Sequence, residues 1–169
     1  VYHNYRTELS NKRLKKEFIV MYAGRLLPGK RVSDLLKDVS KLKTQTSVKL
    51  VIVGDGPEKE NLVKESEQLK LKVEFIDFIN EQKKLFEHYC LADCLVLPSE
   101  DDAWGLVVNE AAAAHLPVIV SDSCGCIYDL VKDDYNGYVY SSKNVKELTE
   151  KIKKLVDNRE KAIEMGQNS

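Results

Sequence analysis

Two basic residues flank a short turn after the first apolar segment. Arg25 follows Gly24, Lys30 comes five positions after Arg25, and an amphipathic segment begins directly afterwards. Backbone N–H groups and the dipole at a helix N-terminus favour an anion, and each basic side chain could add a charge-assisted hydrogen bond of roughly 1.5–3 kcal/mol. The pattern therefore predicts a phosphate or diphosphate site. The alternative is that both residues are solvated charges beside a turn.

A cluster of carboxylates follows the fourth apolar segment. It comprises Glu100, Asp101 and Asp102, and Gly105 then leads into a segment that carries Glu110. Glu100 and Asp101 could simply accept hydrogen bonds from unpaired N–H groups at a helix N-terminus. Glu110 lies in an apolar run, where a carboxylate is expensive to bury unless a ligand hydroxyl pair or a neighbouring lysine pairs with it. We therefore expect Glu110 to contact a ligand.

The elements that position these residues alternate between short apolar segments and amphipathic ones, as in repeated βα units of a parallel sheet. Strands are expected at 18–23, 48–53, 72–76, 94–97, 118–121 and 138–140. The predicted fold is α/β, a Rossmann-like, doubly wound, mainly parallel six-stranded sheet with helices on both faces. In the strand order 3-2-1-4-5-6, ligands bind at the carboxyl ends of the strands, where the order reverses between strands 1 and 4.

Apolar residues at the helical period of 3.6 predict the intervening helices. Three such sets are Val32, Leu35, Leu36, Val39 and Leu42; Leu85, Phe86, Tyr89 and Cys90; and Val145, Leu148, Ile152 and Leu155. Asn144 and Glu147 have the spacing of a capping box for the last helix. Residues 106–114 are apolar on nearly every side apart from Asn109 and Glu110, which predicts a central helix buried by its neighbours.

Length and composition indicate one compact domain without a dominant charge. The chain has 169 residues, 43% of them hydrophobic, and 26 Lys and Arg against 27 Asp and Glu give a net charge of −1. We expect no nucleic-acid partner, because no bulk field would attract the phosphate backbone. Residues 1–17 read as a connecting segment and 18–169 as the domain. Because the chain opens on Val1, we expect it to be part of something longer.

The cysteines and apolar runs point to a reducing cytoplasm. Four cysteines without paired C-x-x-C spacing fit neither a zinc site nor a disulfide scaffold, and no metal site is expected. No apolar run approaches the ~20 residues that span a bilayer. Cys90, Cys94, Cys124 and Cys126 are therefore interpreted as ordinary thiols.

The motifs together resemble glycosyltransferase family 4, retaining enzymes of the GT-B architecture, which have two Rossmann-like domains. The stretch from Asp102 to Glu110 resembles the E-x7-E signature of that family, and Arg25 and Lys30 resemble its diphosphate-binding pair. Segments 51–57, 75–79 and 136–138 resemble its second strand and turn, its base-pocket strand and its closing strand. The resemblance covers nearly the whole chain and corresponds to the C-terminal, nucleotide-sugar-binding domain.

The resemblance implies a role for each candidate residue. Arg25 and Lys30 would hold the donor diphosphate, Glu110 the ribose hydroxyls, and Asp102 would serve as the first acid of the signature. Further residues expected to bind the nucleotide sugar are Gly24, Gly54, Phe78, Trp104, Gly105, Leu106 and Val107. The ligand would be a UDP-, GDP- or ADP-sugar, with no further cofactor and no obligatory metal. The acceptor domain, N-terminal in that architecture, is absent, so the isolated domain should be inactive, and any membrane contact would come through the missing half.

The chain departs from the family pattern at three positions. Asp102 replaces a glutamate, which leaves open whether Asp102 or Glu100 is the first acid. Asp77 and His115 stand where glycines are usual. Asp77 leaves the nucleobase open, whereas His115 precedes Pro117 and is interpreted as a C-terminal helix cap.

Two other functions match parts of the sequence. Gly24 to Lys30 satisfies most of the P-loop pattern, yet Arg31 stands where that motif needs a hydroxyl for magnesium, which argues against an NTPase. A non-catalytic binding or assembly module with the same fold is the main alternative. The presence of Arg25, Lys30 and Glu110 argues against it.

Overall fold

The computed structural model describes residues 17–169. The predicted connecting segment, 1–17, lies outside the described residues apart from Glu17, with which the first strand begins. Six strands form one sheet in the order β3-β2-β1-β4-β5-β6, and every neighbouring pair is parallel. The strands are β1 Glu17–Ala23, β2 Ser47–Val53, β3 Val73–Ile76, β4 Cys94–Leu97, β5 Val118–Ser121 and β6 Gly137–Tyr140. The predicted strand order is confirmed, and the predicted bounds agree to within one residue.

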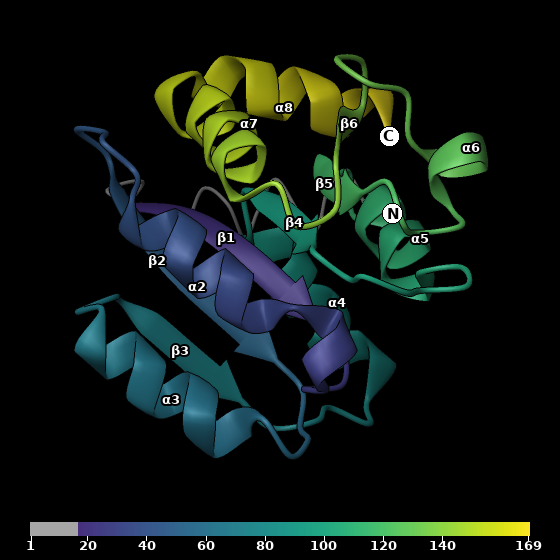
Figure 1. Ribbon diagram of the computed structural model, residues 1–169. Helices are drawn as coiled ribbons and strands as arrows, with labels where there is room; N and C mark the ends of the chain where they lie inside the picture. The colour runs from purple at the N-terminus through teal and green to yellow at the C-terminus, as the bar shows by residue number, and fades with distance from the viewer. Residues whose placement is uncertain (1–16) are drawn as a thin grey trace.

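Helices cover both faces of the sheet (Figure 1). They are the 3-10 turn η1 Pro28–Lys30, α2 Val32–Ser40, α3 Lys59–Gln68, α4 Gln82–Leu91, α5 Leu106–Ala113, α6 Ile127–Leu130, α7 Val145–Asp157 and α8 Arg159–Asn168. Figure 1 shows α2 and α3 in front of the strands and α4 behind them. Because both faces are covered, β4 and β5 are buried along their whole length, which explains their continuous apolar sequences.

The predicted cap of α7 is present, with one difference. The Asn144 side chain accepts a hydrogen bond from the Glu147 backbone N–H, as expected of an N-cap. The Glu147 carboxylate, however, accepts from the backbone N–H of Ser141 at 3.0 Å, and the backbone N–H of Asn144 donates to the Ser141 carbonyl. The reciprocal half of the predicted capping box was therefore wrong, because the preceding turn already satisfies the Asn144 N–H.

The prediction that α5 is buried all round was wrong. Val108 and Ala111 face the core, whereas Leu106 is 70% exposed and Ala113 is also exposed. Alanine is apolar but small, so a run of alanines does not require burial on every face. At the other end of α5, His115 adopts a left-handed conformation at φ 53°, and its N–H donates to the Ala112 carbonyl. The interpretation of His115 as a helix terminus is thereby confirmed.

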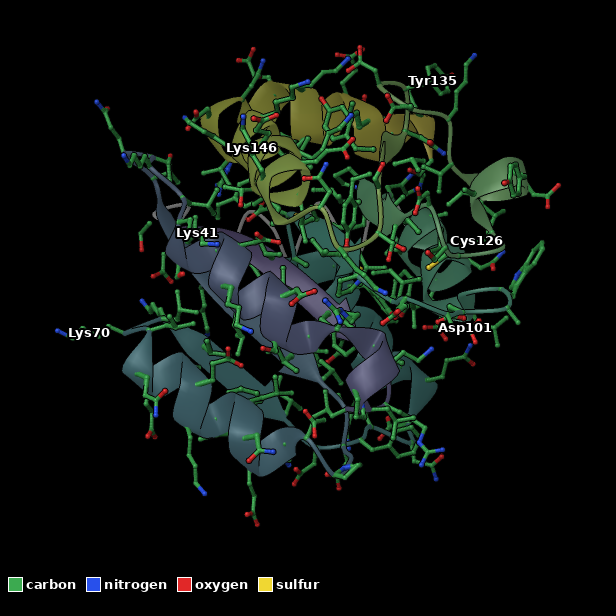
Figure 2. The ribbon with its side chains drawn as sticks, viewed as in Figure 1. Lys41, Lys70, Asp101, Cys126, Tyr135 and Lys146 are labelled. Carbon is green, nitrogen blue, oxygen red and sulfur yellow. The ribbon has the colours of Figure 1, made fainter. Side chains whose placement is uncertain are left out.

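Charged side chains such as those of Lys41, Lys70 and Lys146 project outward, as Figure 2 shows, while all four cysteines are free and buried. Within residues 17–169, His, Cys, Asp and Glu form no group suited to hold a metal ion. None of the described helices combines the length and apolar character needed to cross a bilayer.

The sequence pattern did not reveal a buried carboxylate between α2 and α7. Asp38 is fully buried, and one of its oxygens accepts a hydrogen bond from the Thr149 hydroxyl at 3.0 Å. Its other oxygen has no hydrogen-bond partner in the described structure. Burial raises the pKa of Asp38 to about 7, although Thr149 and Lys41 act to lower it. The negative charge of the nearby Asp34 also raises the pKa of Asp38.

Asp38 should make stability depend on pH. A carboxyl with a raised pKa in the folded state contributes stability that is lost as pH rises from about 4, its unfolded pKa, through about 7. Asp38→Asn should therefore stabilise the fold at pH 8 by up to about 4 kcal/mol, since each pKa unit corresponds to about 1.4 kcal/mol, and by little at pH 4. Urea unfolding at both pH values measures this difference. Asp157→Asn, at an exposed carboxyl, is the control and should give no gain at pH 8; an equal gain there would contradict the assignment.

Candidate functional site

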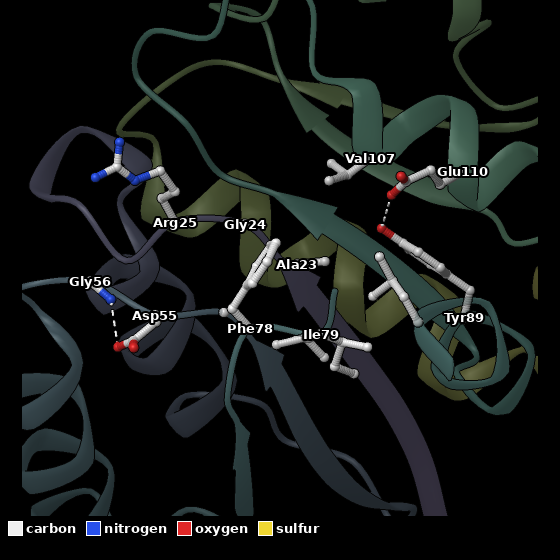
Figure 3. A pocket seen from close by; sticks show the side chains of 13 residues that line it. Ala23, Gly24, Arg25, Asp55, Gly56, Phe78, Ile79, Tyr89, Val107 and Glu110 are labelled. Atoms are coloured by element: carbon white, nitrogen blue, oxygen red, sulfur yellow. Dashed lines mark hydrogen bonds between the residues drawn. The ribbon is translucent and has the colours of Figure 1, made fainter. Parts of the chain in front are cut away.

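A cavity of about 640 Å³ opens at the carboxyl ends of β1, β2 and β3 and is closed on its other side by α4 and α5 (Figure 3). Its lining residues are Ala23, Gly24, Arg25, Val53, Gly54, Asp55, Gly56, Phe78, Ile79, Leu85, Tyr89, Val107 and Glu110. The cavity therefore brings together five of the residues predicted from sequence to bind a nucleotide sugar, namely Gly24, Arg25, Gly54, Phe78 and Val107, together with Glu110.

The floor of the cavity is formed by the turns after β1 and β2, whose backbones are hydrogen-bonded to each other. The Gly24 N–H donates to the Val53 carbonyl at 3.0 Å, and the Leu26 N–H donates to the Asp55 carbonyl at 2.9 Å, so the turns after β1 and β2 are bound to each other. Gly54 has φ +147°, and a Cβ atom there would lie 1.9 Å from the Gly24 carbonyl oxygen. Only a residue without a side chain fits this close approach.

Arg25 and Glu110 lie at opposite ends of the cavity in Figure 3. Arg25 is exposed and has no ion-pair partner among residues 17–169, and the turn that carries it is held by a 2.9 Å hydrogen bond from the Tyr22 hydroxyl to the Arg25 carbonyl. Glu110 is half-buried and accepts a 2.7 Å hydrogen bond from the Tyr89 hydroxyl. A cation and a carboxylate are thus held at the two ends of one largely apolar space.

Lys30 and Asp102 bind each other and are not among the cavity's lining residues. The Lys30 ammonium donates to an Asp102 carboxylate oxygen at 2.6 Å, and both side chains are mostly buried. Each of these two residues is therefore placed beside an opposite charge.

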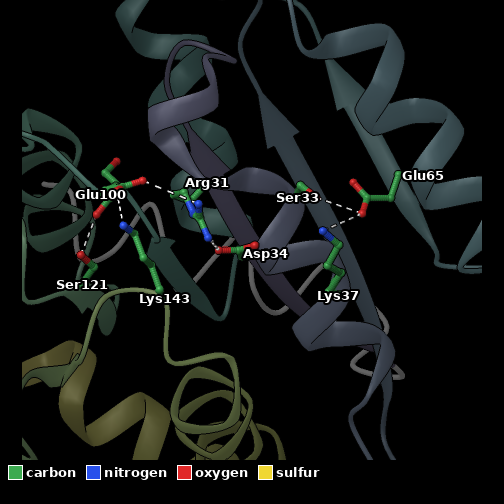
Figure 4. A network of polar contacts seen from close by, with 9 residues as sticks. Arg31, Ser33, Asp34, Lys37, Glu65, Glu100, Ser121 and Lys143 are labelled. Atoms are coloured by element: carbon green, nitrogen blue, oxygen red, sulfur yellow. Dashed lines mark hydrogen bonds and ion pairs between the residues drawn. The ribbon is translucent and has the colours of Figure 1, made fainter.

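Glu100 belongs to a separate ion-pair network, shown in Figure 4. Its carboxylate pairs with Lys143 and lies 3.6 Å from Arg31, which in turn pairs with Asp34 at 2.5 Å. The hydrogen bond from Lys143 holds the pKa of Glu100 below its usual range. Glu100 is therefore directed toward Arg31 and Lys143, whereas Asp102 is directed toward Lys30.

The segment before α5 is held by its own contacts. Gly105 adopts φ +76°, and a Cβ there would lie 2.8 Å from a Leu97 methyl group. The Trp104 indole N–H donates to Asn109 at 3.0 Å. Trp104, Gly105 and Leu106 are not among the cavity's lining residues, although Val107, one residue further on, is.

The rim at β3 carries an exposed aromatic ring. Phe78 is 72% exposed while lining the cavity, so one face of the ring is available to a planar ligand. The preceding residue, Asp77, is directed elsewhere, because it forms an ion pair with Lys59 on α3. The carboxylate at the family's usual glycine position is thus neutralised by a neighbouring lysine.

Sequence reasoning missed several lining residues. Tyr89 and Leu85 were assigned to the apolar face of a helix, and that face turns out to point partly into the cavity. Asp55 also lines the cavity and accepts a hydrogen bond from the Gly56 N–H at 2.8 Å. A tyrosine on a helical face otherwise composed of Leu, Phe and Cys was the available signal, because a buried phenol needs a hydrogen-bond partner.

The strand order defines a Rossmann-like α/β domain, and its cavity lies at the carboxyl ends of the strands, where ligands bind in folds of this kind. Residues 6–169 match the model of the family described as Glycosyl transferases group 1, and the chain belongs to that family. The resemblance to glycosyltransferase family 4 drawn from the motifs is thereby confirmed.

Curated relatives support the same assignment. The chain is 31% identical over 159 residues to poly(ribitol-phosphate) alpha-N-acetylglucosaminyltransferase of Staphylococcus aureus, covering 92% of this chain and 31% of the relative. It is 35% identical over 132 residues to an uncharacterized glycosyltransferase of Methanocaldococcus jannaschii, and the match covers 76% of this chain and 33% of the relative. The chain therefore spans about a third of the length of these relatives.

Solved structures share the fold. A variant of S. aureus TarM, crystallised in complex with fondaparinux, alpha-GlcNAc-glycerol and UDP, superimposes with a TM-score of 0.79 at 28% identity, covering 92% of this chain and 31% of TarM. WaaG, a glycosyltransferase involved in lipopolysaccharide biosynthesis, gives a TM-score of 0.83 at 22% identity, and the match covers 99% of this chain and 45% of WaaG. The predicted Rossmann-like fold of a GT-B glycosyltransferase domain is confirmed by these neighbours.

Proposed function

We propose that this chain is the donor-binding domain of a retaining glycosyltransferase that transfers a sugar from a nucleotide-diphosphate sugar during synthesis of a cell-surface polysaccharide or glycoconjugate. The observation that carries the proposal is the cavity with Arg25 at one end and Glu110 at the other. The cation suits the diphosphate and the carboxylate suits the ribose hydroxyls. The apolar wall between them, including the exposed ring of Phe78, suits the planar base.

We propose UDP as the nucleotide of the donor. TarM, one of the matched structures that contain UDP, is 28% identical to this chain, and the match covers 92% of this chain. The relative that is 31% identical transfers N-acetylglucosamine according to its name. Both facts support a UDP-linked hexose or N-acetylhexosamine over a GDP- or ADP-sugar.

The chemistry proposed for this chain is electrostatic. As the bond between sugar and diphosphate breaks, negative charge develops on the departing phosphate, and Arg25, Lys30 and backbone N–H groups at the start of α5 would stabilise it. Because these groups already supply positive charge, no metal is required in the proposal. The acceptor would be held by a part of the protein outside this chain, so this chain alone should not transfer sugar, since it lacks the proximity contributed by an oriented acceptor.

Calorimetric titration of the purified chain with UDP, GDP and ADP tests the proposal. We expect UDP to bind more tightly than the other two, and EDTA to leave its affinity unchanged. Failure of all three nucleotides to bind would favour a non-catalytic module with the same fold. A strict magnesium requirement together with ATP hydrolysis would favour the P-loop alternative.

Asp102→Asn should affect binding of the UDP-sugar donor and binding of the product UDP differently. Asp102 pairs with Lys30, so the amide should leave binding of bare UDP unchanged or slightly tighter, because a carboxylate that competes with phosphate for Lys30 is removed. Binding of the UDP-sugar should weaken severalfold, if Asp102 turns from Lys30 to a sugar hydroxyl when phosphate arrives. Titration with both ligands measures the difference.

Glu100→Gln is the matched control for Asp102→Asn, since Glu100 pairs with Lys143 and Arg31 instead of Lys30. It should leave both affinities nearly unchanged. A sugar-selective loss in Glu100→Gln would show that Glu100, not Asp102, is the first acid of the signature.

A further inference from the structure

The Glu110 carboxylate is fixed by one neutral donor. Tyr89 lies on α4, which packs against α5, and its hydroxyl donates to one Glu110 oxygen at 2.7 Å. Tyr89 is 1% exposed, so its ring is held by the core while its hydroxyl reaches the cavity that both residues line. The position of the phenol oxygen is therefore set by packing and not by the ligand.

Among residues 17–169, no cation pairs with the Glu110 carboxylate. Within residues 17–169 the structure has no ion pair to its carboxylate, although a neighbouring lysine was one of the two partners expected from sequence. A carboxylate has about four acceptor positions, and a single phenol occupies one of them. The remaining positions, including those of the second oxygen, are left for hydroxyl donors in the cavity.

The Tyr89 hydroxyl can only donate a hydrogen bond to Glu110 and cannot accept one from it. Burial raises the pKa of Tyr89, and the hydrogen bond to Glu110 raises it further, so the phenol stays protonated and donating at any physiological pH. The Tyr89 hydroxyl therefore always directs a hydrogen atom toward Glu110. This contact orients the carboxylate before a ligand arrives, which reduces the ordering needed on binding.

We propose that Tyr89 is a positioning residue for ribose recognition, in which its hydroxyl holds one oxygen of Glu110 so that the other oxygen faces a ribose hydroxyl of the bound nucleotide. The inference rests on the proposed function, because it takes the ligand of Glu110 to be the ribose of a nucleoside diphosphate. It predicts that the Tyr89 hydroxyl raises the affinity for a ribose nucleotide relative to a deoxyribose nucleotide, although it does not contact the sugar itself.

The test compares UDP with its 2′-deoxy and 3′-deoxy analogues in calorimetric titrations of the wild-type chain, Tyr89→Phe, Glu110→Gln and the double variant. Wild type should prefer UDP over at least one deoxy analogue. Tyr89→Phe should reduce that preference by about 3- to 10-fold, the range for one hydrogen bond, while affinity for the deoxy analogue stays within about twofold. In the Glu110→Gln background, Tyr89→Phe should have no further effect, because the phenol acts through the carboxylate.

Tyr138→Phe is the matched control. Tyr138 is also buried and its hydroxyl donates to the carboxylate of Asp134, at 3.3 Å, but it lies on β6 and does not line the cavity. It should leave the preference for ribose unchanged. The ratio of two affinities is also insensitive to partial unfolding, since unfolded chain lowers both apparent affinities equally.

Two results would overturn the inference, and they are distinguishable. If wild type and Glu110→Gln differ in ribose preference but Tyr89→Phe behaves as wild type, or loses both affinities equally, Tyr89 has only a packing role and the proposed function stands. If the wild-type chain binds no nucleoside diphosphate, the proposed function fails and the inference fails with it.

Discussion

Lys30→Ala should weaken UDP binding by about 10- to 150-fold, which corresponds to roughly 1.5–3 kcal/mol for a lost hydrogen bond to a charged group. Two effects act in the same direction. The ammonium that would contact the diphosphate is removed, and Asp102, which now pairs with Lys30 at 2.6 Å, is left as an uncompensated negative charge. Calorimetric titration with UDP measures the loss, and the melting temperature should change little, since Lys30 lies in the η1 turn outside the core.

The double variant Lys30→Ala/Asp102→Asn separates the two effects. Neutralising Asp102 should recover part of the lost affinity, because repulsion between its carboxylate and the phosphates is then absent. Lys37→Ala serves as the control, since Lys37 pairs with Glu65 and does not line the cavity. Unchanged UDP affinity in Lys30→Ala would mean that Lys30 serves only the ion pair with Asp102.

Gly54→Ala should destabilise the fold by more than about 3 kcal/mol. The new Cβ would lie 1.9 Å from the Gly24 carbonyl oxygen, and φ +147° is a conformation that residues with side chains rarely adopt. The three atoms nearest to this Cβ are all backbone atoms of Gly24, so no side chain can rotate to relieve the clash. Relief requires separation of the turns after β1 and β2, which the hydrogen bonds of Gly24 and Leu26 hold together. Urea unfolding of both proteins gives the difference in free energy.

Gly29→Ala is the matched control for Gly54→Ala. A Cβ at Gly29 meets no atom within 4 Å, and its backbone is not in the left-handed region. Its stability should stay within about 0.5 kcal/mol of wild type, as for most exposed substitutions. A comparable loss in both variants would show that the turns tolerate no side chain anywhere, and that the contact between Gly54 and Gly24 has no special role.

The fold was predictable because parallel strands that are buried on both faces have continuous apolar sequences. The uninterrupted apolar sequences of β4 and β5 and the helical periods of α2 and α7 predicted alternating strands and helices, and the strand order was taken from the doubly wound arrangement. Helix α5 shows where the pattern fails, because alanine gives no information on which face is buried. Asp38 was missed for the opposite reason, since one carboxylate on an amphipathic helix looks like part of its solvated face.

The candidate site was predictable in its residues but not in their pairing. Motif spacing selected Arg25 and Glu110, which the structure places in one cavity. It could not show that Lys30 binds Asp102, nor that the partner of Glu110 is a tyrosine from another helix. These contacts join residues that are 72 and 21 positions apart, and they depend on side-chain packing between elements, which no local pattern records.

The uneven pairing of β1 separates the sheet into a first unit, β1–β3, and a second unit, β4–β6, with few paired residues between them. β1 pairs with β2 along its whole length, whereas it pairs with β4 only at Val20 and Met21. The seam between the first three strands and the last three is thus the place where main-chain pairing is shortest, and local opening events of a domain tend to follow such seams. The cavity lies across this seam, with Gly24 and Gly54 on one unit and Glu110 on the other. A nucleotide bound there would act as a clamp between the two units, so that occupancy by donor would slow amide hydrogen exchange well beyond the residues that the donor touches.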